Sequence, residues 1–339
     1  MLMVIFGAGA SWDSANFQVD ATTEQFRPPM GQALFKADNS YARWIDRYEP
    51  MRKVVHRFRG AKDSPTLEAE LEVLQDRSHG RPQTRAQLIA LRYYLQRVVH
   101  ASSQGWSDNL HGNTNYVGLL ETIDAFWTDV RKGQPVVCVT FNYDRLLDGA
   151  FGQIGVKIES LVSYIEHPQY KLIKPHGSVN WFHYVPVPNK ALHNYYHQLL
   201  PGLANEELKA SEEFFVAPEA SDIDEIEGIP ALSIPVAKKT QFEMPTTHLG
   251  VLTAAIPQVS HLLIIGWRGN EQNFVDLLQA LPRGRLTLRS LVVSGSLASA
   301  KAVATALNLN NVAPHISAYG FSGVFGAELE DFLRKQPGQ

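Results

Sequence analysis

The chain has 339 residues, of which 45% are hydrophobic and 19% are charged, as in an ordinary globular protein. Its formal net charge of -3 provides no global field that would attract nucleic acid or an anionic membrane. The single cysteine, Cys138, excludes an intrachain disulfide and a four-cysteine zinc module, and its apolar neighbours predict a core position.

No stretch approaches the roughly 20 apolar residues that a membrane-spanning helix needs. The first residues lack the basic region of a signal peptide, and Gly7 interrupts their apolar run. We therefore expect a cytoplasmic protein that does not enter a membrane.

Short apolar runs that end in glycine or polar residues predict buried parallel strands. They occupy residues 2–6, 135–141, 171–174, 261–265, 290–293 and 314–318. Apolar stripes at helical spacing predict helices at residues 65–77, 84–102, 114–132, 271–281 and 297–308, and an apolar run predicts one after Asp144. Between residue 7 and about residue 30 the sequence predicts a loop.

Strands that alternate with helices of this length predict an α/β protein with a Rossmann-like, doubly wound parallel sheet. We assign residues 1–35 and 134–339 to this domain, and residues 36–133 to an inserted, mainly helical module. Residues 183–245 lose clear periodicity and are rich in Pro, Asn, Glu and Asp, which favours an irregular insertion within the first domain or a small subdomain.

Directly after the first strand comes Gly7-Ala8-Gly9-Ala10-Ser11. Glycine permits a tight turn there, so that backbone N–H groups can face the pyrophosphate of a dinucleotide. The usual dinucleotide fingerprint, GxGxxG, has a third glycine where this chain has Trp12. The match is therefore incomplete, and a plain strand-to-loop turn explains the two glycines equally well.

Asn142 and Asp144 follow the strand at 135–141, at the sheet edge where α/β proteins bind ligands. Asn142 could contact a ribose or a water, although either residue could instead cap the helix that begins at about residue 145. His176 and Gly177 follow the strand at 171–174, where a histidine can act as a general base near neutral pH. Since the chain has 12 histidines, a hydrogen-bonded loop histidine is the simpler interpretation of His176 alone.

Two more strand-end loops lie at the same predicted edge. Gly266 begins the segment Gly-Trp-Arg-Gly-Asn, which ends at Asn270, and Ser294 begins the segment Ser-Gly-Ser. Each is compatible with ordinary loop structure when taken alone. Because all these segments share one edge and a fixed order, the set is more specific than any member.

In order and spacing, GAGAS at 7–11, TFNYD at 140–144, PHGS at 175–178 and GWRGN at 266–270 resemble the motifs of the SIR2-like (sirtuin-related) family. The resemblance spans nearly the whole chain and is closer to bacterial SIR2-like antiphage-defence NADases than to deacetylase sirtuins. Deacetylases resemble one another in a four-cysteine zinc ribbon after the His-Gly pair, whereas residues 178–339 here contain no cysteine. Arg268 stands in place of the serine of the family's G-x-S loop, which leaves Asn270 as a substitute for the ribose contact.

The resemblance implies an NAD+ hydrolase that cleaves the nicotinamide–ribose bond and depletes NAD in antiphage defence. Asn142 would orient the ribose or the attacking water, and His176 would be the general base. Asp144 would hold the nicotinamide carboxamide or steady the cationic ribose. The other expected ligand contacts are Gly7, Ala8, Gly9, Ala10, Ser11, Gly177, Gly266, Asn270 and Ser294. NAD is expected as the substrate, and no metal is expected.

Three alternatives stay open. The chain could be an NAD-dependent deacylase or ADP-ribosyltransferase, or a sensor that binds NAD or ADP-ribose and regulates a partner. It could also act on nucleic acid through the basic run between Arg52 and Lys62, although a solvated helix face explains that run better. We expect a homo-oligomer and, from the resemblance, a partner protein of a defence system, such as an ATPase or an Argonaute-like protein.

Two further features have ordinary explanations. His193 and His197 have the i, i+4 spacing of a helical metal pair, but no third ligand stands out, so we interpret them as surface histidines. The acidic stretch 205–228 is predicted to be a solvated loop.

Overall fold

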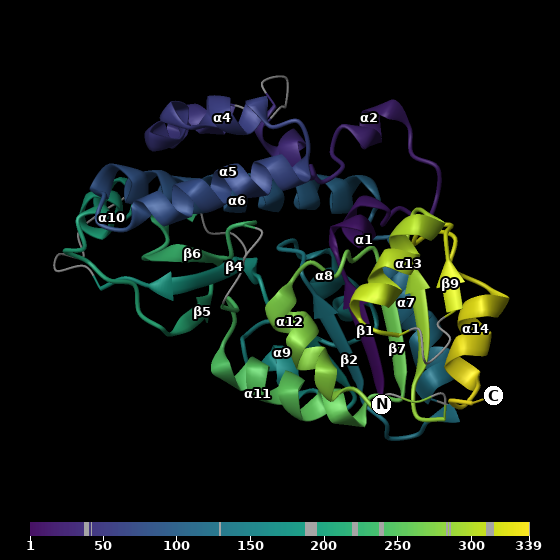
Figure 1. Ribbon diagram of the computed structural model, residues 1–339. Coiled ribbons are helices and arrows are strands. Elements are labelled where there is room, and N and C mark those ends of the chain that lie inside the picture. Colours follow the sequence, from purple (N-terminus) through teal and green to yellow (C-terminus); the bar gives the residue numbers. More distant parts are fainter. Residues whose placement is uncertain are drawn as a thin grey trace. The chain divides into compact units, whose positions relative to one another are not determined.

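The computed structural model describes residues 1–36, 41, 43–128, 130–186, 195–218, 223–236, 241–282, 284, 286–309 and 315–338. The chain forms two compact units (Figure 1). The first combines Met1–Pro28, Ser103–Pro175 and Met244–Gln339, and the second combines Pro29–Ser102 and His176–Glu243. The helices between residues 29 and 102 therefore group with residues 176–243, whereas the sequence predicts that these two segments belong to different domains.

The first unit is built on six parallel strands in the order β3-β2-β1-β7-β8-β9. Their bounds are Leu2–Phe6 (β1), Val136–Thr140 (β2), Tyr170–Ile173 (β3), His261–Ile265 (β7), Arg289–Val293 (β8) and His315–Ser317 (β9). Each agrees with its predicted strand to within one residue at either end, because continuous apolar runs are typical of strands buried on both faces. The α/β, Rossmann-like prediction is confirmed.

The strand order places a topological switch point between β1 and β7. From β1 the chain adds β2 and β3 on one side, and it then returns to add β7, β8 and β9 on the other. In open α/β sheets, ligands bind outside the carboxyl ends of the strands at such a point. The turn that begins at Gly7 and the turn that begins at Gly266 both lie there.

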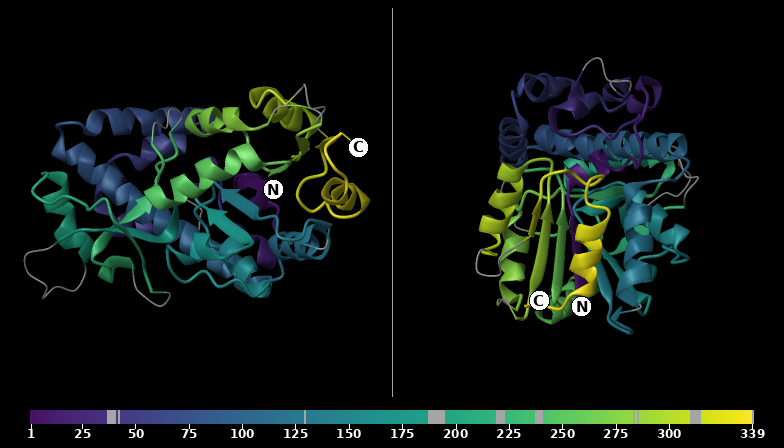
Figure 2. Two further views of the ribbon diagram at one scale, coloured as in Figure 1. Left: turned by 90° about the horizontal axis from the view of Figure 1, so that it is seen from below. Right: turned by 90° about the vertical axis from the view of Figure 1, so that its right-hand side faces the viewer.

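Helices cover both faces of this sheet (Figure 2). They are α7 (Asn115–Ile123), α8 (Leu146–Gln153), α9 (Ser163–Glu166), α11 (Thr246–Ala255), α12 (Gln272–Leu277), α13 (Leu297–Ala306) and α14 (Ala327–Arg334). The predicted helix at 114–132 is shorter as an α-helix, because it continues after Ile123 as the π-turn η3 (Asp124–Thr128). The predicted helix at 271–281 likewise ends in a 3-10 turn, η6 (Leu278–Ala280).

The loop predicted between residue 7 and about residue 30 is wrong in part. It contains α1 (Ala8–Trp12) and α2 (Ala21–Glu24). The first forms because Asp13 N donates to Gly9 O at 3.0 Å and closes the turn. The second begins where the Asp20 side chain accepts from Thr23 N at 2.7 Å, as an N-cap residue does.

The second unit contains an antiparallel sheet in the order β5-β4-β6. Its strands are Gly177–Tyr184 (β4), Phe214–Val216 (β5) and Gly228–Leu232 (β6), and its helices include α3 (Arg43–Arg47), α4 (Val55–Gly60), α5 (Ser64–Ser78), α10 (Tyr195–Ala204) and the part of α6 (Pro82–Asn109) up to residue 102. The segment 183–245 is therefore not irregular throughout, because it contains α10, β5 and β6. The sequence does not reveal β4 because two buried polar residues, Ser178 and Asn180, interrupt its apolar run.

A buried carboxylate also corrects the prediction of a solvated acidic loop. Asp224 is 2% exposed and forms ion pairs with Arg47 and Arg97, and Tyr48 Oη donates to it at 3.1 Å. These partners neutralise a charge that could not otherwise be buried.

Cys138 is fully buried in β2, as predicted. Within the described part of the chain, no helix is both long enough and apolar enough to cross a membrane.

One core residue, His261, makes the stability of the fold depend on pH. His261 at the start of β7 is fully buried between the rings of Trp127 and Phe332, at centroid distances of 4.8 and 5.5 Å. Its Nε2 lies 2.8 Å from Lys335 O. Burial lowers the pKa of His261 from 6.5 to about 4, so the folded protein holds this ring neutral where the unfolded chain protonates it.

A depressed histidine pKa contributes stability that is present above pH 6.5 and is lost as the pH falls toward 4. We expect the parent protein to lose about 3 kcal/mol of unfolding free energy between pH 7 and pH 4 relative to a His261→Phe variant. Urea titrations of both proteins at several pH values measure this difference. Parallel profiles over that range would contradict it.

Candidate functional site

The turns after β1 and β7 touch through their backbones. Gly9 N donates to Gly266 O at 3.2 Å. A Cβ added to Gly7 would lie 2.5 Å from Trp267 Cα, and one added to Gly266 would lie 2.4 Å from Ala10 N. Gly266 also has φ +62, in the region that favours glycine. Glycine is thus required at these positions by the packing of one turn against the other.

This contact uses several of the amides that the sequence assigns to pyrophosphate binding. The N–H groups of Gly7, Gly9 and Ala10 already donate to the carbonyls of Ile265, Gly266 and Gly7. The turn therefore offers a phosphate fewer free donors than its five residues suggest.

Four buried side chains meet beside this turn, and we call Ser11, Tyr116, Asn142 and Asp144 the polar cluster. Asn142 Nδ2 lies 2.8 Å from Ser11 Oγ, 3.1 Å from Tyr116 Oη and 3.0 Å from Gly7 O. An amide nitrogen has two hydrogens, so it serves two of these three acceptors at once. Ser11 Oγ in turn donates to Asp144 Oδ2 at 2.7 Å.

Asp144 is held from both sides. Its Oδ1 accepts from Leu146 N, the first residue of α8, at 3.0 Å, although the N-cap residue of that helix is Arg145. Burial raises the pKa of Asp144, while Lys174 and the hydrogen bonds from Ser11 and Leu146 N oppose that shift. The cluster therefore surrounds a carboxylate whose charge is costly to bury.

Tyr116 on α7 is a member of the cluster that the sequence analysis does not identify. It is 1% exposed, and burial raises the pKa of its hydroxyl well above 10, so it stays protonated. Its place in an apolar helix stripe gives no sign of a polar role. The available signal is that a buried tyrosine hydroxyl needs a hydrogen-bond partner.

Aromatic side chains connect the segment TFNYD at 140–144 to the segment GWRGN at 266–270. Phe141 stacks on Trp267 at 5.3 Å with an interplanar angle of 7°, and Phe274 packs edge-on against both rings. Trp267 Nε1 donates to Glu271 Oε2 at 2.7 Å. The loop that carries Asn142 is thereby fixed to the loop that follows Gly266.

The other predicted contacts lie on different elements of the fold. Ser294 follows β8 at the same sheet edge, where its N donates to Ser317 O. Asn270 is exposed in the loop before α12. His176 and Gly177 belong to the second unit, whereas Asn142 belongs to the first.

The backbone of the second unit itself requires glycine at position 177. Gly177 is the first residue of β4, its φ is +81, and an added Cβ would lie 1.9 Å from Ala231 O in β6. His176 is 5% exposed, and its carbonyl accepts from Ser233 N at 3.0 Å. The His-Gly motif therefore begins a strand.

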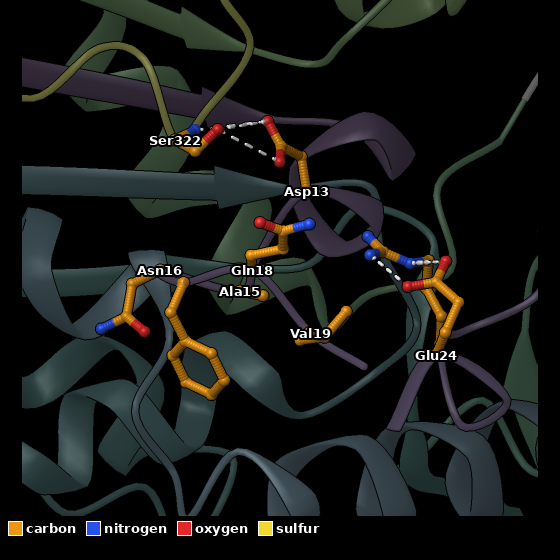
Figure 3. A pocket seen from close by; sticks show the side chains of 9 residues that line it. Asp13, Ala15, Asn16, Gln18, Val19, Glu24 and Ser322 are labelled. Carbon is orange, nitrogen blue, oxygen red and sulfur yellow. Dashed lines mark hydrogen bonds and ion pairs between the residues drawn. The ribbon is translucent and has the colours of Figure 1, made fainter. Parts of the chain in front are cut away.

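A pocket of about 470 Å³ lies just beyond α1 and was not predicted. Figure 3 shows a hydrogen-bonded pair, Asp13 and Ser322, at one side of the pocket, and Asn16, Gln18 and Glu24 around it. Arg27 contributes to the lining, and its guanidinium lies between the indoles of Trp12 and Trp106, 4.9 and 4.8 Å from their centroids. The volume of the pocket suits a small molecule.

No group of three or more His, Cys, Asp or Glu side chains in the described residues could hold a metal ion. His197 is exposed on α10, and His193 lies outside the described residues. No protein-family model matches the sequence, and a search of curated proteins finds no match.

The contact between the two turns can be tested with a pair of glycines. Gly266 and Gly269 both have positive φ, but the nearest atom to an added Cβ at 269 is Ala306 Cβ at 3.6 Å. We expect Gly269→Ala to cost about 1 kcal/mol from backbone strain alone, and Gly266→Ala to cost roughly 3 kcal/mol more. Chemical denaturation measures both. Equal losses would show that the close approach is unimportant.

Proposed function

We propose that this protein is an NAD+ hydrolase that cleaves the nicotinamide–ribose bond. The observation that carries the proposal is the meeting of Gly7, Ser11, Asn142 and Asp144 at the switch point of a Rossmann-like sheet. Dinucleotides bind such sheets there. The chain's resemblance to SIR2-like NADases supports the choice of cleavage over hydride transfer.

The protein does not need to protonate the leaving group, because the nicotinamide ring is already cationic. The C1′–N bond breaks, its electron pair returns to the pyridine ring, and nicotinamide leaves uncharged. Water forms the new C1′–O bond and gives its proton to a base. The transition state resembles an oxocarbenium ion, so the site must stabilise positive charge and orient the water.

The polar cluster is suited to these tasks. Protein acceptors hold the amide nitrogen of Asn142, so this residue would present its carbonyl oxygen to the ribose or the water. Asp144 would steady the cationic ribose or hold the nicotinamide carboxamide. His176 would take the proton from the water, a role assigned to it by the resemblance alone.

Within the same proposal, hydrolysis depletes NAD during antiphage defence in the cytoplasm. The active form would be a homo-oligomer, with a partner protein such as an ATPase or an Argonaute-like protein. Acyl-lysine chemistry is disfavoured because the chain lacks the four cysteines of a zinc ribbon. An NAD or ADP-ribose sensor would differ by leaving its ligand intact.

The test is incubation with NAD+ while nicotinamide and ADP-ribose are followed by chromatography. We expect His176→Ala and Asn142→Ala each to reduce nicotinamide release by about a hundredfold or more. His56→Ala is the matched control, because His56 is an exposed residue of α4. Release at the parental rate by both site variants would overturn the assignment, and an intact ligand after binding would favour the sensor.

A further inference from the structure

A buried lysine lies directly behind the polar cluster, and the proposed chemistry does not use it. Lys174, the residue after β3, is 0% exposed. Its Nζ donates to Asp148 Oδ2 at 3.0 Å and to the main-chain carbonyl of Asp144 at 2.6 Å. Lysine is among the residues least often buried, so this position calls for a physical reason.

The ion pair is complete on the carboxylate side. The side chain of Asp148 on α8 is 1% exposed, and its other oxygen accepts from Tyr164 Oη on α9 at 2.5 Å. Three segments therefore converge on one buried charge pair. Such a pair is weak evidence for stability, because well-packed apolar side chains often serve as well or better.

What an apolar pair could not supply is the bond from Lys174 to the Asp144 carbonyl. That carbonyl belongs to the loop that carries Asn142 and Asp144. Ser11 and Leu146 N hold the side chain of Asp144, and Lys174 holds its backbone. The loop is thus fixed through both its side chains and its main chain.

We propose that Lys174 is a positioning residue for the loop of Asn142 and Asp144, with Asp148 and Tyr164 orienting its ammonium group. The effect on turnover rests on the proposed function, whereas the effect on the loop does not. Lys174 acts through the Asp144 peptide: it keeps the carboxylate and the amide in one arrangement, which a site that must orient a ribose and a water requires.

The decisive variant combines Lys174→Met with Asp148→Leu. It removes the Lys174 ammonium together with the Asp148 carboxylate, so neither is left buried without the other, and we expect Tm to stay within about 3 °C of the parent. We expect amide exchange in the peptide 141–148 to become about tenfold faster, measured by mass spectrometry. We also expect kcat for nicotinamide release to fall about a hundredfold while KM changes little.

Two more variants complete the test. Lys171→Met is the matched control: Lys171 lies on β3, the strand that Lys174 follows, and donates to His167 O, so exchange in 141–148 and turnover should be parental. Tyr164→Phe keeps the ring and loses one bond to Asp148, so it should speed exchange less than the double variant does. If the double variant does not fold, Tyr164→Phe decides alone.

Parental exchange in 141–148 for every folded variant other than the control would overturn the proposal. So would a double variant with faster exchange and parental kcat. If the parent protein itself releases no nicotinamide, the proposed function fails, and the exchange rates alone decide whether Lys174 fixes the loop.

Discussion

The first unit depends on the contact between two backbone turns, where the chain after β1 meets the chain after β7. A side chain at Gly7 or Gly266 would occupy the space that the other turn fills. This contact sets the position of Gly7 O, which accepts from Asn142, and the start of α1, which carries Ser11. The polar cluster is thus built on a turn whose position is set by the packing of the sheet.

The same contact explains how far the sequence could predict this structure. Strands such as Leu2–Phe6 were predictable because an uninterrupted apolar run is typical of a strand covered on both faces. The glycines were ambiguous, because a turn that admits phosphate and a turn that admits another backbone require the same residue. Tyr116 was not predictable, because its partners lie 105 residues before it and 26 residues after it in the chain. β4 was missed because two buried polar residues, Ser178 and Asn180, interrupt the apolar run that identifies a strand covered on both faces.

The charges behind the loop have a bearing on the proposed chemistry. Asp144 and Asp148 are both buried, and Lys174 forms an ion pair with the Asp148 carboxylate while it donates to the main-chain carbonyl of Asp144. Burial raises the pKa of Asp144, and Lys174 together with the hydrogen bonds from Ser11 and Leu146 N opposes this shift. In the proposed reaction, a cationic nicotinamide ring or an oxocarbenium-like ribose beside Asp144 would favour the ionised form of this carboxyl group.

Both units use a buried carboxylate to join segments that are distant in sequence. Asp148 connects α8 to α9 and to the end of β3, and Asp224 connects its 3-10 turn to α3 and α6. The two carboxylates differ in the number of positive charges beside them. Asp224 contacts two arginines and a tyrosine, whereas Asp148 contacts one lysine and a tyrosine. Apolar contacts alone tolerate small sliding movements, whereas a carboxylate with directional donors fixes one register. Lys174 donates to Asp148 and also to the main-chain carbonyl of Asp144, and this second hydrogen bond connects the buried ion pair to the loop of the candidate site.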